Sequence, residues 1–74
     1  MAKDKLVSRM RANPRGDWTI DDLVTVAAGF GIDVAPGKGS HRVFRFPDGS
    51  ILSVPARRPI KAVYIKQFTD KLVE

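Results

Sequence analysis

The stretch HRVFRFPDGSILSV, residues 41–54, decides the fold because it predicts two strands joined by a tight turn. Polar and apolar side chains alternate along HRVFRF, which places Phe44 and Phe46 together on one face of a strand. The opposite face receives the other members of the run, His41, Val43 and Arg45. Pro47–Gly49 is typical of a turn, because proline fixes the first corner and glycine accepts a left-handed backbone. SILSV then returns as a strand whose apolar residues share the phenylalanine face, Leu52 and Val54.

A second strong pattern, WTIDDLVTVAAGFGI, lies before the hairpin and predicts an amphipathic helix. Thr19 is placed to cap its amino end, and Asp22 follows at the spacing of a capping box. Trp18, just before the cap, is expected to pack against Leu23. The apolar residues of the expected buried face recur at helical spacing: Ile20, Leu23, Val24, Ala27 and Phe30. Two glycines stand where the helix should stop, Gly29 and Gly31.

The remaining segments complete the predicted fold. A short helix is expected over residues 3–12, a short strand over residues 32–36, and a last helix with Pro59 in its first turn. The apolar stripe of that last helix is read as Ile60, Val63, Tyr64, Phe68 and Leu72. The order helix, helix, strand, strand, strand, helix predicts one α+β domain over residues 1–74. A three-stranded antiparallel sheet would have helices packed on one face, in two layers, and an open face carrying His41 and Arg45.

Composition excludes several classes of protein. A chain of 74 residues is the size of one small domain. It has no cysteine, which excludes disulfides and zinc–thiolate sites and fits a reducing compartment. With a single histidine and few clustered carboxylates, we expect no metal and no cofactor. No apolar run is long enough for a membrane span, and the first residues lack the apolar centre of a signal peptide, so a cytoplasmic protein is expected.

The net charge of +5 is unevenly distributed along the chain. Residues 1–33 carry equal numbers of basic and acidic side chains, whereas residues 34–66 carry seven basic side chains against Asp48 alone. The basic residues of this segment are Lys38, Arg42, Arg45, Arg57, Arg58, Lys61 and Lys66. Such a segment attracts polyanions, and phosphate contacts dominate affinity for nucleic acids. Charge alone fits a solvated basic surface equally well.

His41 is the only side chain suited to moving protons near neutral pH, and it lies within the basic segment. Neighbouring cations would favour the neutral imidazole, which can act as a base, and would also hold a phosphate. The preceding Gly37 and Gly39 allow close backbone approach and a positive φ. Ser40 is a poor nucleophile candidate, because it points to the other strand face and no acid orients a base beside it. Before this context is considered, a lone strand histidine is more often structural than catalytic.

The segment KGSHRVFRFPDGSILSVP, with the helix before it and IKAVYIKQF after it, resembles the HicA-type toxins of bacterial toxin–antitoxin pairs. The resemblance covers about residues 18–72 and leaves residues 1–17 as a helical extension. It implies a fold similar to the double-stranded RNA-binding domain and the activity of an mRNA interferase, a small endoribonuclease. It also implies that His41 is catalytic, that Gly39 and Ser40 form the supporting loop, and that a HicB-like antitoxin binds the protein.

Two departures from the family pattern affect the site. Many members carry a second histidine where this chain has Arg42, which would then serve as a phosphate clamp. Many also have a His-Gly-Gly-Lys loop before the last helix, where this chain reads ARRPIK and keeps the charge without the glycines. The predicted RNA-binding residues are Lys38, Arg42, Arg45, Arg57, Arg58 and Lys61.

Three functions follow as hypotheses. The first is a toxin that cleaves mRNA without a metal, through His41, and is a monomer when free of its antitoxin. The second is a non-catalytic RNA-binding module in which His41 only hydrogen-bonds the backbone. The third is a protein-interaction domain whose basic face binds an acidic partner. Cleavage of RNA by the isolated protein separates the first from the other two.

Overall fold

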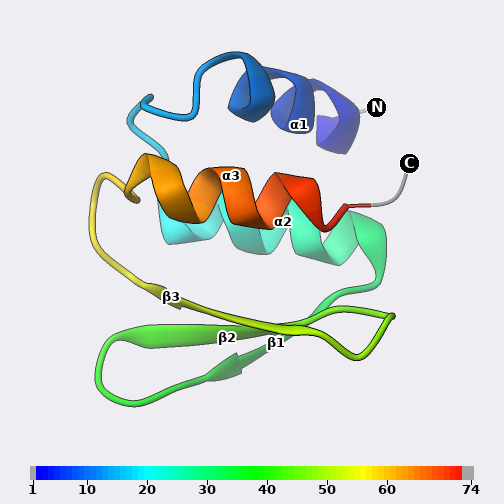
Figure 1. Ribbon diagram of the computed structural model, residues 1–74, viewed down its shortest axis with the longest axis vertical. Coiled ribbons are helices and arrows are strands. Elements are labelled where there is room, and N and C mark those ends of the chain that lie inside the picture. The colour runs from blue at the N-terminus through cyan, green and yellow to red at the C-terminus, as the bar shows by residue number, and fades with distance from the viewer. Residues whose placement is uncertain (1, 73–74) are drawn as a thin grey trace.

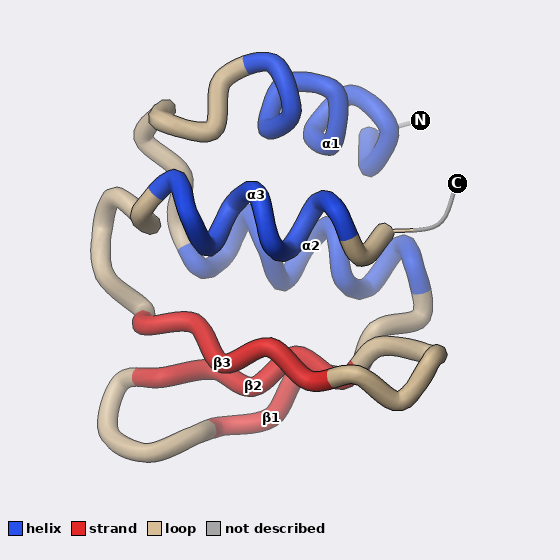
Figure 2. The backbone as a smooth tube through the Cα atoms, in the orientation of Figure 1, coloured by secondary structure: helices blue, strands red, loops and turns tan. Residues whose placement is uncertain are grey.

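The computed structural model describes residues 2–72, with side chains from residue 5 onward, as an α+β fold in three layers (Figure 1). The elements follow the predicted order: α1 (Ala2–Ala12), α2 (Ile20–Phe30), β1 (Asp33–Pro36), β2 (His41–Arg45), β3 (Ile51–Pro55) and α3 (Ala62–Asp70). Helices α2 and α3 both lie over one face of the sheet, and α1 lies on the far side of these two helices (Figures 1 and 2).

The predicted hairpin is confirmed as the centre of an antiparallel sheet with strand order β1-β2-β3. Phe44 lies opposite Leu52 on one side and Val34 on the other, and Phe44 is fully buried. The turn closes where proline and glycine predicted it: the Gly49 N–H donates to the Phe46 carbonyl at 2.9 Å, and Gly49 has a φ of 90°. The alternation of the strands therefore turns the phenylalanine face towards the helices.

The core fills the space between the sheet and the helix pair. Phe68 of α3 meets the Phe44 ring edge-on, with centroids 5.3 Å apart, and lies 5.9 Å from the Phe46 ring. The capping box of α2 is present in full, with Thr19 and Asp22 each accepting from the other's backbone N–H. Gly31 ends α2 in the left-handed conformation, as its position predicts.

Helix α1 adds a third layer, so the two-layer expectation was incomplete. Val7 and Met10 are buried against α2 and α3 and belong to the same apolar core. The Arg11 guanidinium donates to the Thr69 carbonyl at 3.1 Å, near the carboxyl end of α3. The extension before residue 18 is therefore an integral part of the fold.

Two predicted helix faces were partly wrong. Val24 and Val63 are 37% and 52% exposed, whereas Val26 and Ile65 are fully buried. In α3 the prediction failed because the helix begins at Ala62 and not at Pro59. Ile60 is buried from the extended segment before α3, and the buried stripe of the helix itself then starts at Ile65.

Within residues 2–72, none of the helices combines the length and hydropathy that crossing a membrane requires.

Candidate functional site

The turn that carries His41 joins β1 to β2. The His41 N–H donates to the Lys38 carbonyl at 3.1 Å, and the Gly37 N–H donates to the His41 carbonyl at 2.9 Å. Gly39, at the first corner, has a φ of 61°, whereas Ser40 at the second corner does not have a positive φ. This is the pattern of a type II′ turn, which requires glycine at the first corner. The GKGS sequence thus holds the histidine at the first position of β2.

Gly37 packs directly against the residue that it helps to position. A Cβ atom on Gly37 would lie 3.2 Å from the His41 Cβ and 3.1 Å from the Val43 Cγ2. Both distances are shorter than ordinary van der Waals contact, so a larger residue would displace the histidine or the valine. The sequence predicts at Gly37 a close approach of the backbone to a ligand, and the close contact in the structure is with side chains of β2.

One ring nitrogen of His41 is already engaged. Nδ1 lies 3.1 Å from the Lys38 carbonyl oxygen, and a carbonyl can only accept a hydrogen bond. In the neutral ring Nδ1 therefore carries the hydrogen, and Nε2 keeps the lone pair. This tautomer leaves Nε2 as the atom able to accept a proton from a ligand.

The half-buried His41 side chain lines a pocket of about 510 Å³ at the end of the sheet. The other walls come from the segment between β3 and α3, which Figure 2 shows as a long loop, and from the first turn of α3. The residues that complete the lining are Pro55, Arg57, Arg58, Pro59, Ile60, Lys61 and Tyr64. The volume lies within the range of small-ligand sites, so the pocket can take a group larger than a phosphate.

The pocket gathers only half of the predicted RNA-binding side chains. Arg57, Arg58 and Lys61 line it together with His41. Arg45 lies exposed at the other end of β2, opposite Ile51. Lys38 does not line the pocket and contributes its carbonyl to the His41 ring.

Arg42 and Ser40 have local partners. The half-buried Arg42 guanidinium donates to the His41 carbonyl at 3.3 Å, and Arg42 is not part of the pocket lining. The Ser40 carbonyl accepts from the Ala56 N–H at 3.1 Å, while the residue itself is exposed. Both residues therefore take part in hydrogen bonds that hold the backbone around His41.

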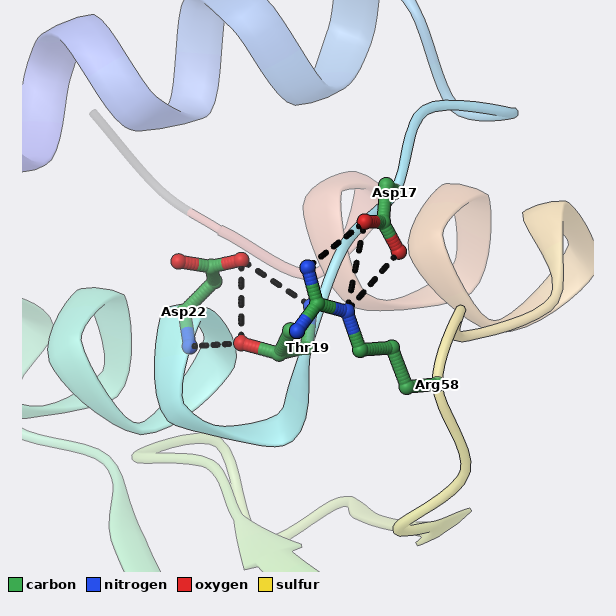
Figure 3. A network of polar contacts seen from close by, with 4 residues as sticks. All are labelled: Asp17, Thr19, Asp22 and Arg58. Carbon is green, nitrogen blue, oxygen red and sulfur yellow. Dashed lines mark hydrogen bonds and ion pairs between the residues drawn. The ribbon is translucent and has the colours of Figure 1, made fainter.

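Arg58 is the one pocket cation with an acidic partner among the side chains described (Figure 3). Its guanidinium makes a two-pronged contact with the Asp17 carboxylate, with the shortest hydrogen bond at 2.8 Å. These hydrogen bonds lower the pKa of Asp17 and raise that of Arg58. Arg57 and Lys61 have no such carboxylate among residues 5–72, so their charge remains available to an anion.

The pocket wall is fixed to the rest of the fold at several points. The Ile60 N–H donates to the Trp18 carbonyl at 2.8 Å, and the Trp18 indole N–H donates to the Asn13 carbonyl at 2.7 Å. Trp18 is buried, and the Arg9 guanidinium lies 5.7 Å from the centre of its ring. The segment before α2 therefore supports the segment before α3.

Helix α3 begins at this pocket without a cap. Lys61 occupies the N-cap position, makes no side-chain capping bond, and no acidic residue follows in the first turn. The N–H groups of Ala62 and Val63 donate to no acceptor in the described part of the chain, whereas those of Tyr64 and Ile65 reach the Lys61 carbonyl. Free N–H groups at a helix start favour anions.

Sequence reasoning missed the apolar wall of the pocket. The sequence predicts Tyr64 only as part of an apolar stripe and gives no role to Pro55, yet both line the pocket beside His41. The available signal was the place of Tyr64, three residues after Lys61 at the end of the basic segment 57–61. Among the described residues, no group of three or more histidine, cysteine, aspartate or glutamate side chains is placed to hold a metal ion.

Comparisons with models of known protein families, with curated proteins and with solved structures find no match to this chain.

Proposed function

We propose that this protein is a HicA-like mRNA interferase that cleaves RNA through His41. The observation that carries the proposal is the His41 imidazole itself. Its Nδ1 is held by the Lys38 carbonyl, and its ring lines a pocket that also contains Arg57 and Lys61. A base with a fixed tautomer beside unpaired cations is what phosphodiester cleavage by a ribose hydroxyl requires.

In the proposed reaction, His41 Nε2 takes the proton from a ribose 2′-hydroxyl. The 2′ oxygen forms a bond to the adjacent phosphorus as the bond from phosphorus to the 5′ oxygen breaks. The products are a 2′,3′-cyclic phosphate and a 5′-hydroxyl, and the leaving 5′ oxygen takes a proton from water or from the Lys61 ammonium. Arg57, Lys61 and the free N–H groups of Ala62 and Val63 support the charge that builds on the phosphate oxygens.

The resemblance to HicA toxins supplies the biological setting of the proposal. The matching segment, residues 18–72, contains the whole run from α2 to α3, and the order of its elements fits a fold similar to the double-stranded RNA-binding domain. A HicB-like antitoxin is the expected partner, the cytoplasm the expected compartment, and a monomer the expected state of the free toxin. Arg42, which replaces a second histidine of the family pattern, would act by holding the His41 carbonyl.

A non-catalytic RNA-binding module is the second candidate, and one observation favours it. The hydrogen bond from His41 Nδ1 to the Lys38 carbonyl would alone account for a histidine at this turn. Basic side chains around the pocket would then bind phosphates without reaction.

The decisive experiment compares wild type and His41→Ala on a single-stranded RNA. We expect the variant to lose at least about 100-fold in cleavage rate, with an unchanged circular dichroism spectrum and thermal midpoint. A substrate with a single 2′-deoxyribose at the cleaved linkage should resist the wild type. His41→Gln serves as a matched control for side-chain size and polarity, and should be equally inactive.

Two outcomes would contradict the enzyme. Cleavage retained by both His41 variants would remove the histidine from the mechanism. RNA binding by a wild type that leaves the strand intact would favour the binding module.

A further inference from the structure

The pocket beside His41 is not lined as a site for phosphate alone. Its lining combines three cations with the apolar side chains of Pro55, Pro59 and Ile60 and with the Tyr64 ring. A phosphate gains nothing from apolar surface, because it needs hydrogen bonds and opposite charge. The combination suits a group that joins an anion to a flat apolar ring, and a nucleotide is such a group.

Tyr64 is well placed to provide the stacking surface. It is the third residue of α3, is half-buried, and packs against the core. Its N–H donates to the Lys61 carbonyl at 3.0 Å, so the first turn of the helix fixes its backbone beside Lys61. An aromatic ring held in this way loses little conformational entropy when a base stacks on it.

We infer that Tyr64 and the neighbouring prolines form a subsite for one nucleobase, and that Arg57 and Lys61 bind the phosphate of the same nucleotide. The inference rests on the proposed function only in placing this nucleotide next to the linkage that His41 cleaves. A base can lie on Tyr64 only when it is unstacked from its neighbours, so the site selects single-stranded RNA over a duplex.

Two small ligands that differ only in the base provide the direct test. Adenosine 5′-monophosphate carries base, sugar and phosphate, whereas ribose 5-phosphate lacks the base. NMR titration of the intact protein should show the nucleotide binding at least about five-fold more tightly, with upfield shifts of the Tyr64 ring protons. Equal affinities, or nucleotide binding that leaves the Tyr64 ring signals in place, would overturn the subsite.

Variants at Tyr64 separate the ring from its hydroxyl and from its part in the core. Tyr64→Phe keeps the ring and should keep the preference for the nucleotide. Tyr64→Leu keeps an apolar side chain against the core, and should bind both ligands equally while remaining folded. A Tyr64→Leu protein that still prefers the nucleotide would overturn the role of the ring.

The Tyr64 variants, together with an RNA that carries an abasic residue, distinguish the base subsite from the proposed enzymatic activity. If the subsite is right and the enzyme is wrong, the nucleotide preference appears but no RNA is cleaved. If the enzyme is right and the subsite is wrong, an RNA with an abasic residue on either side of the cleaved linkage is cut as fast as the intact strand. If both are right, an abasic residue on one side should lower kcat/KM about five-fold or more, and Tyr64→Leu should remove that difference.

Discussion

The two helices that cover the sheet begin in opposite ways. At α2, Thr19 and Asp22 satisfy each other's backbone N–H groups, and two acidic residues occupy the first turn. At α3, Lys61 makes no capping bond, and the first turn has no acidic residue. An uncapped helix start costs about 1 kcal/mol relative to a good cap, so α3 forgoes stability that α2 obtains. The N-terminus of α2 therefore stabilises the fold, whereas the N-terminus of α3 leaves backbone N–H groups that an anion can accept from.

The aromatic residues beside these starts differ in the same way. Trp18 is 7% exposed, and both its indole N–H and its carbonyl are engaged within the protein. Tyr64 is half-buried and lines the pocket. Both rings lie next to basic side chains, and burial decides which ring is a structural support and which can receive a ligand.

Removing Trp18 should have the largest effect on stability. Trp18→Ala would leave a cavity and loosen the segment that holds Ile60, so we expect a loss of about 3–5 kcal/mol in the free energy of unfolding. Tyr64→Leu should cost about 1 kcal/mol. Chemical denaturation measures the free energy of unfolding of both variants. Equal losses would contradict the difference in structural role between Trp18 and Tyr64.

Removing the α2 cap should have the next largest effect. Thr19→Ala should lower the free energy of unfolding by about 1 kcal/mol, because the hydroxyl that accepts from the Asp22 N–H and donates to the Asp22 carboxylate is lost. RNA cleavage per folded molecule should not change, because the capping pair lies outside the pocket lining. A fall in kcat at a temperature where the variant is fully folded would show that the α2 start also serves the site.

Adding a cap to α3 should produce a smaller effect of opposite sign. Lys61 has extended dihedral angles, φ −62° and ψ 143°, which suit a capping serine. Lys61→Ser should therefore be about 0.5–1 kcal/mol more stable than Lys61→Gln. Both variants should bind RNA more weakly, and the slope of log affinity against log salt should fall by about one.

Lys66→Gln is the matched control for that experiment. It removes the same charge from an exposed position of α3 that does not line the pocket. Lys61 variants with the affinity and salt slope of Lys66→Gln would mean that the open start of α3 binds no phosphate.

The Asp17–Arg58 pair should have the smallest effect, because both side chains are largely exposed. The pKa of Asp17 is lowered from 3.8, so the pair adds stability above that pH and loses it as the pH falls through the lowered value. The thermal midpoint of Asp17→Asn should lie below that of the wild type at pH 7, and the gap should close in acid. Asp17→Asn should also bind RNA slightly more tightly, since Arg58 would be released. A gap that persists below the lowered pKa would mean that the carboxylate charge is not what matters.

The sequence predicted the features that depend on neighbouring residues. The capping box, the Pro47–Gly49 turn and the two faces of β2 follow from side chains a few positions apart. The start of α3 could not be predicted in the same way. Pro59 suits a helix, but the Ile60 N–H is taken by the carbonyl of Trp18, a contact between distant parts of the chain.

The sequence predicts a basic segment around His41, but it does not predict which side chains share a pocket with His41. Arg45 is predicted on the same open sheet face as His41, but the length of β2 separates the two residues. Alternation along the strand turns the Arg42 side chain away from the sheet face that carries His41. Its guanidinium donates instead to the His41 carbonyl. Tyr64 joins His41 only because the segment before α3 folds back beside the first residue of β2.

The outer position of α1 matters for anyone who shortens the chain. Trimming the protein to residues 18–72 would remove Val7 and Met10 from the core and the Arg11 donor from the end of α3. The faces of α2 and α3 that α1 covers would then be exposed to solvent as an apolar surface prone to aggregation. Expression and assays should therefore keep the first seventeen residues, even though no catalytic role is given to them.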